Sequence, residues 1–510
     1  MSRPRRGLLA FGLILAALAV LVPGLAVARP GGGEGYSGGG DSGGGGGGDG
    51  DSGFVWLLLR LWIEFCIAYP HIGIPITIAV LLYLHFKRKK KAKAGPQNWD
   101  AAPSHAHPPA GPAARPRSLD LEAIRKLDPD FSVVLFEDFA YALYARAYQA
   151  HASRRDLDAL APYLSEAARQ RIEQRRPVGA PVQGVVVGAL RVVDLSLPQA
   201  GIPDARVAVV LEIESNMTLG MAGAEQTQYA RERWRLVRSA AARTKPPQDV
   251  RTFHCPNCGA PFEASDRPGG DRCSYCGEVV SGGRFDWSVE SIDLLSLEER
   301  PPALTTTVQE VGTNWPTVFH ADLPARRAEL LRDDPAATDE ALVARLQLIY
   351  NELNAAWTRL DLGGARPYVS DNLFDYLLYW TSAYQKQGLR NVLENMRLME
   401  STPVKVVRDR YYDALTFRIW GAGRDYTVRQ GTGDVVSGNP RADRFYSEYW
   451  TLIRGAGVKG APRTERSCPN CGAPLDINMA GECEHCGAKI TTGRFDWVLS
   501  KIEQDDSYTG

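Results

Sequence analysis

The sequence predicts an α+β protein with two domains, each made of helices packed on one face of a curved antiparallel sheet and each followed by a small zinc ribbon. Three observations predict this class. Eight of the nine cysteines form C-x-x-C pairs. The segment that contains these cysteines occurs twice, roughly 210 residues apart. In each copy, segments with helical spacing of apolar residues precede segments with alternating apolar residues.

Length and composition allow several globular domains. The 510 residues are enough for about two to four domains of ~100–200 residues each. An apolar content of 44% and a charged content of 23% are ordinary for globular proteins. The formal net charge is zero, which gives no support for a globally basic nucleic-acid binder.

The first 53 residues have the pattern of a signal and a tether. Residues 1–28 combine early arginines, an apolar run and the small residues AVA at 26–28, as in an export signal. An uncleaved first membrane helix is the alternative. Residues 29–53 are mostly Gly, with Ser and Asp, so they cannot bury a core and are expected to form a flexible tether.

Residues 54–86 are expected to form an interfacial segment followed by a transmembrane helix. The 22 residues from Phe65 to Phe86 contain no Asp, Glu, Lys or Arg. At ~1.5 Å per residue they span ~33 Å, enough for the ~30 Å hydrocarbon core. Residues 87–118 then form a basic flank, which begins KRKKKAK, and a Pro/Ala linker. A basic flank is typical of the cytoplasmic side of a transmembrane helix, so we expect residues 95–510 in the cytoplasm. The same basic residues are expected to attract anionic lipid headgroups.

The paired cysteines make two complete tetrathiolate sets. The first set is Cys255, Cys258, Cys273 and Cys276, and the second set is Cys468, Cys471, Cys483 and Cys486. Each C-x-x-C turn presents two sulfurs to one ion, and the glycine after the second cysteine permits the tight turn. Two such turns complete the closed tetrahedral form of a structural zinc site, so we expect two structural zinc ions and no catalysis at either. Iron in a rubredoxin-like site is the chemical competitor.

The repeat extends well beyond the cysteines. RRDLDALAPYLSEAA at 154–168 matches RLDLGGARPYVSDNL at 359–373, and YARERWRLVRS at 229–239 matches FYSEYWTLIRG at 445–455. The drift in spacing between the copies indicates small loop insertions inside one duplicated unit. We expect a first domain over 119–245, its ribbon and strand over 251–297, a connector over 298–337, a second domain over 338–458, and its ribbon and strand over 464–503.

Within each copy the expected order is helix, helix and then strands. In the first copy the helices are expected over 131–153 and 160–175, with Ser165 or a neighbour near the start of the second, and the strands over 182–197, 205–219 and 228–239. In the second copy the helices are expected over 339–360 and 372–388, and the strands over 402–423 and 444–455.

The second copy also carries a family resemblance. From DLGGARPYVSDNLFDYLLYWTSAYQKQGLRNVLENMRL to FYSEYWTLIR, about 361–455, it resembles the C-terminal domain of mitochondrial import inner membrane translocase subunit 44, as found in bacterial membrane proteins. The first copy is a more divergent match without GLRNVLENM, and the ribbons are additions to the family pattern. The resemblance implies two cone-shaped domains of the nuclear transport factor two-like type, each with a hydrophobic pocket between helices and sheet. It also implies attachment at the inner membrane of a bacterium, in a single or double pass.

Other recurring residues have structural interpretations. Trp234 and Trp450 recur inside a strand, as core or pocket-lining residues. GRFDW recurs at 283–287 and 493–497, and we expect a strand that docks the ribbon onto its partner domain, with Phe and Trp inward and Asp outward. No G-x-S-x-G, P-loop or H-E-x-x-H motif occurs, so we do not expect an enzyme.

These observations predict a membrane-anchored, cytoplasm-facing scaffold that holds a protein segment or lipid in pocketed domains, in protein translocation or membrane biogenesis. The expected partners are membrane lipid and a protein that the sequence does not identify. Docking of nucleic acid or of a partner through the ribbons is the alternative. Cations near the first ribbon favour it, namely Arg243, Lys245, Arg251, Arg267 and Arg272, but interleaved acids and the neutral charge disfavour nucleic acid. A hydrolase or isomerase that uses the domain pocket is a third interpretation.

Overall fold

The computed structural model describes residues 119–510, with gaps at 151–153, 176–180, 199–201, 203, 221–224, 263–271, 301–303, 305–309 and 311. The expected signal, tether, transmembrane segment and basic flank therefore lie outside the described residues. In the part that is described, no helix has the length and apolar character needed to cross a membrane.

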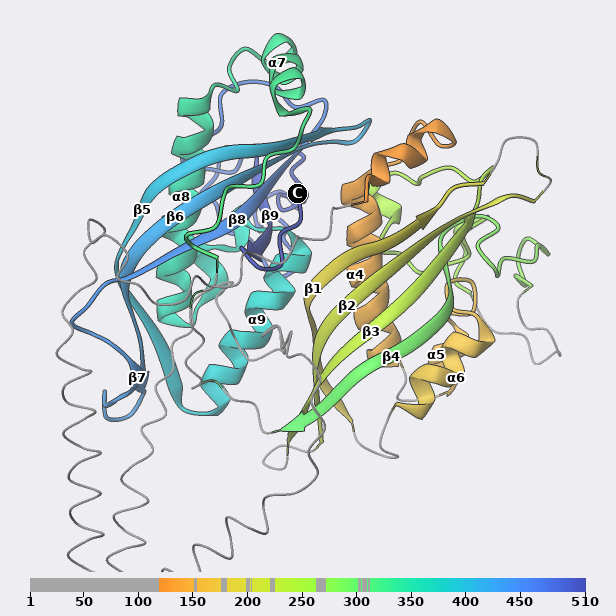
Figure 1. Ribbon diagram of the computed structural model, residues 1–510, viewed down its shortest axis with the longest axis horizontal. Helices are drawn as coiled ribbons and strands as arrows, with labels where there is room; N and C mark the ends of the chain where they lie inside the picture. Colours follow the sequence, from red (N-terminus) through yellow and green to blue (C-terminus); the bar gives the residue numbers. More distant parts are fainter. Residues whose placement is uncertain are drawn as a thin grey trace, which may run out of the picture. The chain divides into compact units, whose positions relative to one another are not determined.

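The first α+β unit begins with its helices. They are the 3-10 helix η1 (Leu121–Lys126) and the α-helices α4 (Val133–Ala150), α5 (Arg154–Asp158) and α6 (Glu166–Gln174). The start of α6 confirms the expectation for Ser165, because its hydroxyl accepts the backbone N–H of Ala168 at 3.1 Å. Apolar residues of α4 recur every three or four positions, so one side of this helix packs on the sheet (Figure 1).

The first sheet has four antiparallel strands in the order β1-β2-β3-β4. They are β1 (Val182–Ser196), β2 (Arg206–Leu219), β3 (Gln226–Ser239) and β4 (Ser288–Arg300). The short 3-10 helix η2 (Pro247–Asp249) and the first cysteine set lie between β3 and β4. Since β4 pairs with β3 along its length, the cysteine module is an insertion between the last two strands of the sheet.

The second unit repeats this arrangement. Its helices are α7 (Leu323–Asp333), α8 (Asp339–Arg359), η3 (Leu362–Gly364), η4 (Arg366–Tyr368) and α9 (Asp371–Lys386). Its strands are β5 (Leu389–Arg408), β6 (Tyr412–Arg429), β7 (Val435–Gly438), β8 (Arg444–Gly455) and β9 (Val498–Gln504). The sheet order is β5-β6-β8-β9, with β7 paired to β6, and the second cysteine set again precedes the last strand.

Helices α4, α6, α8 and α9 confirm the four expected helices, although α6 is shorter than expected, and other segments differ from the expectations. Helix α7 lies in the stretch expected to be a connector. The strand expected over 402–423 is two strands, because the Asp409 carboxylate accepts the N–H groups of Tyr411 and Tyr412 and turns the chain. The stretch GLRNVLENM forms the start of β5.

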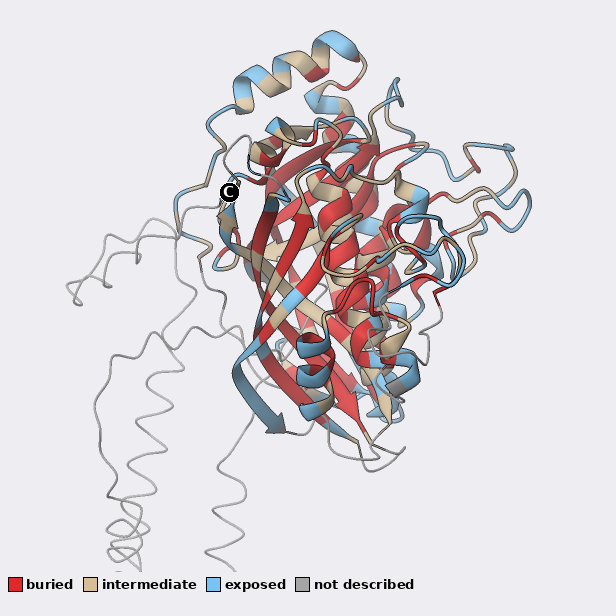
Figure 2. Cartoon of the chain, turned by 90° about the vertical axis from the view of Figure 1, so that its right-hand side faces the viewer, coloured by how far each residue is buried: buried red, intermediate tan, exposed pale blue. Residues whose placement is uncertain are grey.

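Each unit has its core between helices and sheet, where buried residues concentrate in Figure 2. Residues that correspond in the sequence repeat also lie at corresponding positions in the two units. In the first unit Tyr144 and Trp234 are buried, and Trp234 lies opposite Leu211 in the sheet. In the second unit Tyr350 is buried and Trp450 lies opposite Phe417. The copies therefore share one architecture as well as one sequence pattern.

A buried ion pair recurs in both units. In the first unit the Arg238 guanidinium donates to the Asp128 carboxylate at 2.8 Å and lies 4.8 Å from the ring centre of Trp287. In the second unit Arg454 donates to Asp334 at 2.8 Å and lies 4.5 Å from the ring centre of Trp497. We call this arrangement the aspartate–arginine–tryptophan clamp. It joins the loop before the first long helix, the third strand of the unit and the chain that returns from the ribbon.

The GRFDW sequences are turns rather than strands, and they precede β4 and β9. Their tryptophans are buried, as expected. The expectation of an outward aspartate is wrong for Asp496, which is 9% exposed and accepts the N–H of Arg463 at 2.7 Å. Asp286 is half-buried and pairs with Lys245 at 3.1 Å. In both copies this aspartate interacts with the loop that precedes the ribbon. It therefore points inward, although the alternation of GRFDW predicts an outward side chain.

Candidate metal centres

The structure brings the eight paired cysteines together as two separate clusters. Within each set of four, the ligand sulfurs all lie within 4.8 Å of one another. In the first set Cys255 is 3.9 Å from Cys276, and Cys258 is 3.9 Å from Cys273. A disulfide would require ~2.05 Å between sulfurs. Four sulfurs at ~2.3 Å from a zinc ion lie ~3.8 Å apart in a tetrahedron, so the spacing fits that ion.

Local backbone geometry positions the sulfurs. Each C-x-x-C-G turn closes with the glycine N–H donating to the carbonyl of the first cysteine, as from Gly259 to Cys255 at 2.9 Å. The four glycines Gly259, Gly277, Gly472 and Gly487 have φ between 69° and 76°. A β-carbon at these positions would meet no atom within 4 Å, so the left-handed backbone, rather than space, requires glycine.

Asparagine side chains add a second layer around the sulfurs. Asn257 donates its side-chain amide to Cys276 at 3.5 Å, and Asn470 donates to Cys486 at 3.4 Å. Hydrogen bonds of this kind orient ligand sulfurs and stabilise their charge. Each cluster offers four thiolate ligands and leaves no open ligand position. This is the donor set of a structural zinc ion.

The first ribbon is attached to the helices of its own unit. Phe253, two residues before the first cysteine, packs against Phe139 and Tyr163 with ring centres 5.9 and 5.4 Å apart. The Tyr163 hydroxyl donates to the carbonyl of His254 at 2.7 Å. The second ribbon is attached to the start of α9, where the Thr491 hydroxyl donates to Asp371 and Lys489 pairs with it, both at 2.8 Å.

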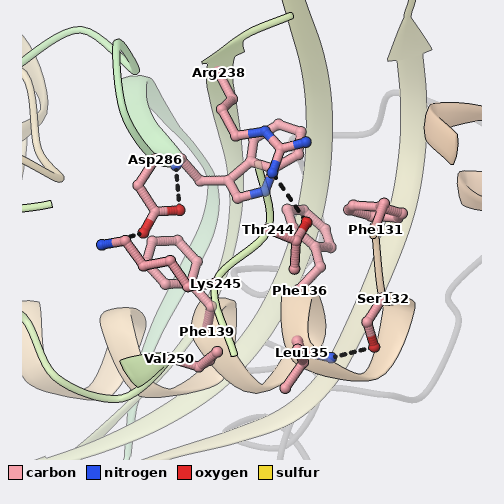
Figure 3. A pocket seen from close by; sticks show the side chains of 11 residues that line it. Phe131, Ser132, Leu135, Phe136, Phe139, Arg238, Thr244, Lys245, Val250 and Asp286 are labelled. Carbon is pink, nitrogen blue, oxygen red and sulfur yellow. Dashed lines mark hydrogen bonds and ion pairs between the residues drawn. The ribbon is translucent and has the colours of Figure 1, made fainter. Parts of the chain in front are cut away.

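A pocket in the first unit adjoins the clamp (Figure 3). It has about 310 Å³ of empty volume, which includes open solvent, and the side chains of Phe131, Phe136, Phe139, Arg238, Lys245 and Asp286 are among those that line it. In the second unit Arg345 occupies the position of Phe139 in the repeat. Its guanidinium donates to the carbonyls of Trp497 and Arg463 at 2.8 Å, and its side chain lines a second pocket with about 340 Å³ of empty volume.

The two recurring strand tryptophans lie in the cores. Trp234 is 1% exposed and donates its indole N–H to Glu232 at 3.1 Å. Trp450 is 2% exposed and donates to Glu448 at 2.8 Å. Each carboxylate lies two residues before its tryptophan, so the pattern E-x-W is part of the repeat. These side chains fill the space between helices and sheet in which the family resemblance implies a pocket.

Three aspartates and one arginine form a cluster at a contact between the units. Arg251 lies 3.2 Å from Asp375, 3.6 Å from Asp371 and 4.0 Å from Asp138. The Asn372 amide donates to Asp138. Burial raises the pKa of Asp138 to about 6, although the charge of Arg251 opposes this shift. The carboxylate of α4 therefore shares one cation with two carboxylates of α9.

This cluster predicts a pH-dependent stability. The folded-state pKa of Asp138, about 6, lies above its ordinary value of 3.8, so its protonation stabilises the folded protein. That contribution is complete below the unfolded pKa and is lost as the pH rises through about 6. We therefore expect Asp138→Asn to raise the melting temperature at pH 7.5 and to raise it less at pH 5. Thermal unfolding at the two pH values measures this, with the exposed Asp434→Asn as control, and an equal gain at both pH values would contradict it.

The cations near the first ribbon are mostly engaged. Lys245 pairs with Asp286, Arg251 pairs with the aspartates of α9, and Arg243 donates to the carbonyl of Leu127 at 2.8 Å. Arg272 donates to the carbonyl of Gly277, and Arg267 lies outside the described residues. The described cations therefore do not make a row of available phosphate contacts.

Sequence reasoning missed the buried ionic groups. The clamp arginine stands in both repeated segments, YARERWRLVRS and FYSEYWTLIRG. Its recurrence at Arg238 and Arg454 was visible, and so was that of the aspartates before each long helix. Nothing in the sequence indicated that these charges meet, because they lie more than 100 residues apart.

Comparison with known protein families identifies the second unit as a known type of domain. Residues 326–463 match the model of a family described as Tim44-like domain. No curated protein matches the chain. The match covers α8, α9 and strands β5 to β8, so it contains the helices and most of the sheet of this unit. The chain therefore contains one Tim44-like domain, an NTF2-like binding fold, together with a second α+β unit of similar construction and two four-cysteine clusters.

Proposed function

We propose that this protein is a membrane-anchored, cytoplasm-facing scaffold of the bacterial inner membrane that binds a protein segment or lipid through its two α+β units. Structural zinc in each ribbon holds the last two strands of a sheet together. The single observation that carries the proposal is the Tim44-like binding fold at 326–463, which occurs beside a second unit of the same construction. Two similar units on one anchor raise the effective concentration for a bivalent partner.

Binding accounts for the interior polar groups better than catalysis does. Glu448 accepts hydrogen bonds from Trp450 and from Gln504 at 2.8 and 3.0 Å. Glu232 is held in the same way by neighbours in the first unit. A general base needs a carboxylate that reaches a substrate proton, and these two are occupied by fixed donors. We therefore favour a scaffold over a hydrolase or isomerase.

Nucleic-acid docking through the ribbons remains the second candidate. Tyr275 favours it, since this aromatic side chain lies between two ligand cysteines and is 66% exposed, as a base-stacking residue would be. The ion pairs of Lys245 and Arg251 argue against it, because those cations are neutralised within the chain.

Site-specific photocrosslinking in intact membranes tests the two candidates. A photoreactive phenylalanine analogue is placed at Met399 and Phe445, which are 58% and 50% exposed in the Tim44-like domain, and separately at Tyr275. We expect lipid or protein adducts at the first two positions, identified by mass spectrometry. Nucleic-acid adducts at Tyr275 with none at the other two positions would favour the second candidate. The absence of any adduct at Met399 and Phe445 would contradict the scaffold.

A further inference from the structure

The interior of the first unit contains a fully satisfied carboxylate. Glu232 is 1% exposed. Its Oε1 accepts from the Tyr148 hydroxyl at 2.6 Å and from Arg175 Nη1 at 2.8 Å. Its Oε2 accepts from the Tyr144 hydroxyl at 3.0 Å and from Trp234 Nε1 at 3.1 Å. Four donors fill the lone pairs of this carboxylate, so Glu232 needs no further partner.

The arginine beside it is only half satisfied. The Arg175 side chain is 3% exposed, and its Nη1 donates to Glu232 and, at 3.1 Å, to the Tyr144 hydroxyl. Its Nε and Nη2 are buried and have no hydrogen-bond partner in the part of the chain that the structure describes. These two nitrogens form one edge of the guanidinium, the edge that takes a planar carboxylate through two parallel hydrogen bonds. Buried N–H groups without a partner are costly, so this edge calls for an acceptor.

Two leucines of the edge strand lie beside Glu232, the partner of this arginine. In the pairing of β3 with β4, Leu294 lies opposite Glu232 and Leu297 lies opposite Ala230. Directly paired residues share a face of the sheet, so both leucines are on the face that carries Glu232. They are 39% and 38% exposed. Both leucines are therefore exposed on β4, the edge strand of the sheet (Figure 1).

The second unit has neither feature at the position equivalent to Glu232. Its equivalent carboxylate, Glu448, accepts from Gln504 at 3.0 Å, where the first unit uses an arginine. Strand β9 ends at Gln504, and the next residue, Asp505, pairs with Arg418 at 2.9 Å. The leucine pair therefore has no counterpart at this position of the second unit. The unpaired guanidinium edge and the leucine pair occur together in the first unit, which lies outside the Tim44-like match.

We propose that Arg175 binds the carboxylate of a fatty acid whose hydrocarbon chain lies over Leu294 and Leu297. A planar monoanion fits the free guanidinium edge, and the apolar chain covers the exposed leucines. A phosphate ester would bring up to two negative charges close to Glu232, which disfavours it. This proposal rests on the binding function proposed above and names its ligand in the first unit.

Photolabelling of the full-length, zinc-loaded chain in nanodiscs tests this assignment. The probes are a diazirine-bearing C12 fatty acid and the corresponding alcohol, which lacks the carboxylate. We expect the acid to label the peptide that contains residues 291–299 at least ~10-fold more than the alcohol does, since only the acid forms the bidentate pair. We expect Arg175→Lys to remove most of this preference, because lysine keeps the charge beside Glu232 but lacks the planar edge.

Controls separate loss of binding from loss of folding. Arg171→Gln changes an exposed arginine of the same helix and is expected to leave labelling unchanged. Leu294→Asn with Leu297→Asn changes two partly exposed residues and is expected to weaken labelling by acid and alcohol alike. Equal labelling by the two probes, labelling that Arg175→Lys does not alter, or stronger competition by dodecyl phosphate than by dodecanoate would overturn the proposal. If Met399 and Phe445 still crosslink to lipid or protein, that failure leaves the scaffold function standing.

Discussion

Loss of the second metal ion is expected to detach β9 from its sheet. The ribbon lies between β8 and β9, and β9 has only seven residues, so the ordered ribbon is what brings this strand back to β8. Structural zinc supplies apparent folding free energies of ~10–16 kcal/mol in small zinc domains at neutral pH. We expect Cys483→Ser, which removes a ligand that is 2% exposed, to abolish most of that contribution and to unfold the ribbon.

Hydrogen exchange measured by mass spectrometry checks this expectation. Exchange should rise at residues 464–504 and along the facing edge of β8, while α4 of the first unit keeps its protection. The matched control is Cys66→Ser, which changes the one cysteine outside the two sets. Unchanged protection of β9 in Cys483→Ser would show that the strand does not depend on the metal-bound ribbon.

Truncation of the clamp aspartate is expected to destabilise the first unit by ~3–5 kcal/mol, the usual cost of leaving a buried charge unpaired. Asp128 is fully buried, and it accepts from Arg238 at 2.8 Å and from the backbone and hydroxyl of Thr244 at 2.9 and 2.6 Å. Asp128→Ala removes these hydrogen bonds, together with the one from the Asp130 N–H at 3.3 Å, and leaves the buried Arg238 guanidinium without its counter-charge.

Denaturant unfolding followed by tryptophan fluorescence measures this change, since Trp234 and Trp287 report on the first unit. The control is Asp130→Ala, two residues away, whose partner Arg410 is 63% exposed. A pair of that kind contributes ~0–1 kcal/mol. The double substitution Asp128→Leu with Arg238→Met should recover much of the loss, because it removes the uncompensated charge. Equal effects of Asp128→Ala and Asp130→Ala would contradict the role of the clamp.

Features with a local sequence signature were predictable. The C-x-x-C-G spacing specifies a turn that presents two sulfurs, and the structure places all eight of these sulfurs in two clusters. The helical spacing of α8 and α9 is similarly local, and Ser165 was recognisable as a helix start because a serine before a helix caps its free N–H groups. The duplication also identified Trp234 and Trp450 as equivalent core positions.

Features that depend on distant partners were not predictable. Nothing local to GRFDW indicates that the strand after it returns to β3, so the ribbon was expected to follow the sheet rather than to interrupt it. Asp496 was expected to face outward, because its acceptance of the Arg463 N–H depends on a loop 33 positions earlier. In the sequence Arg175 resembles any charged residue at a helix end. Only the structure shows that it pairs with Glu232 and that its Nε and Nη2 have no hydrogen-bond partner among the described residues.

We infer that each sheet is interrupted before its last strand by a ribbon built on one four-sulfur zinc site. X-ray absorption at the zinc edge, combined with elemental analysis of the purified chain, tests it most directly. We expect two zinc ions per polypeptide, each with four sulfur neighbours at ~2.3 Å. Far less than two equivalents of zinc, or a site with nitrogen or oxygen in place of a sulfur, would contradict it.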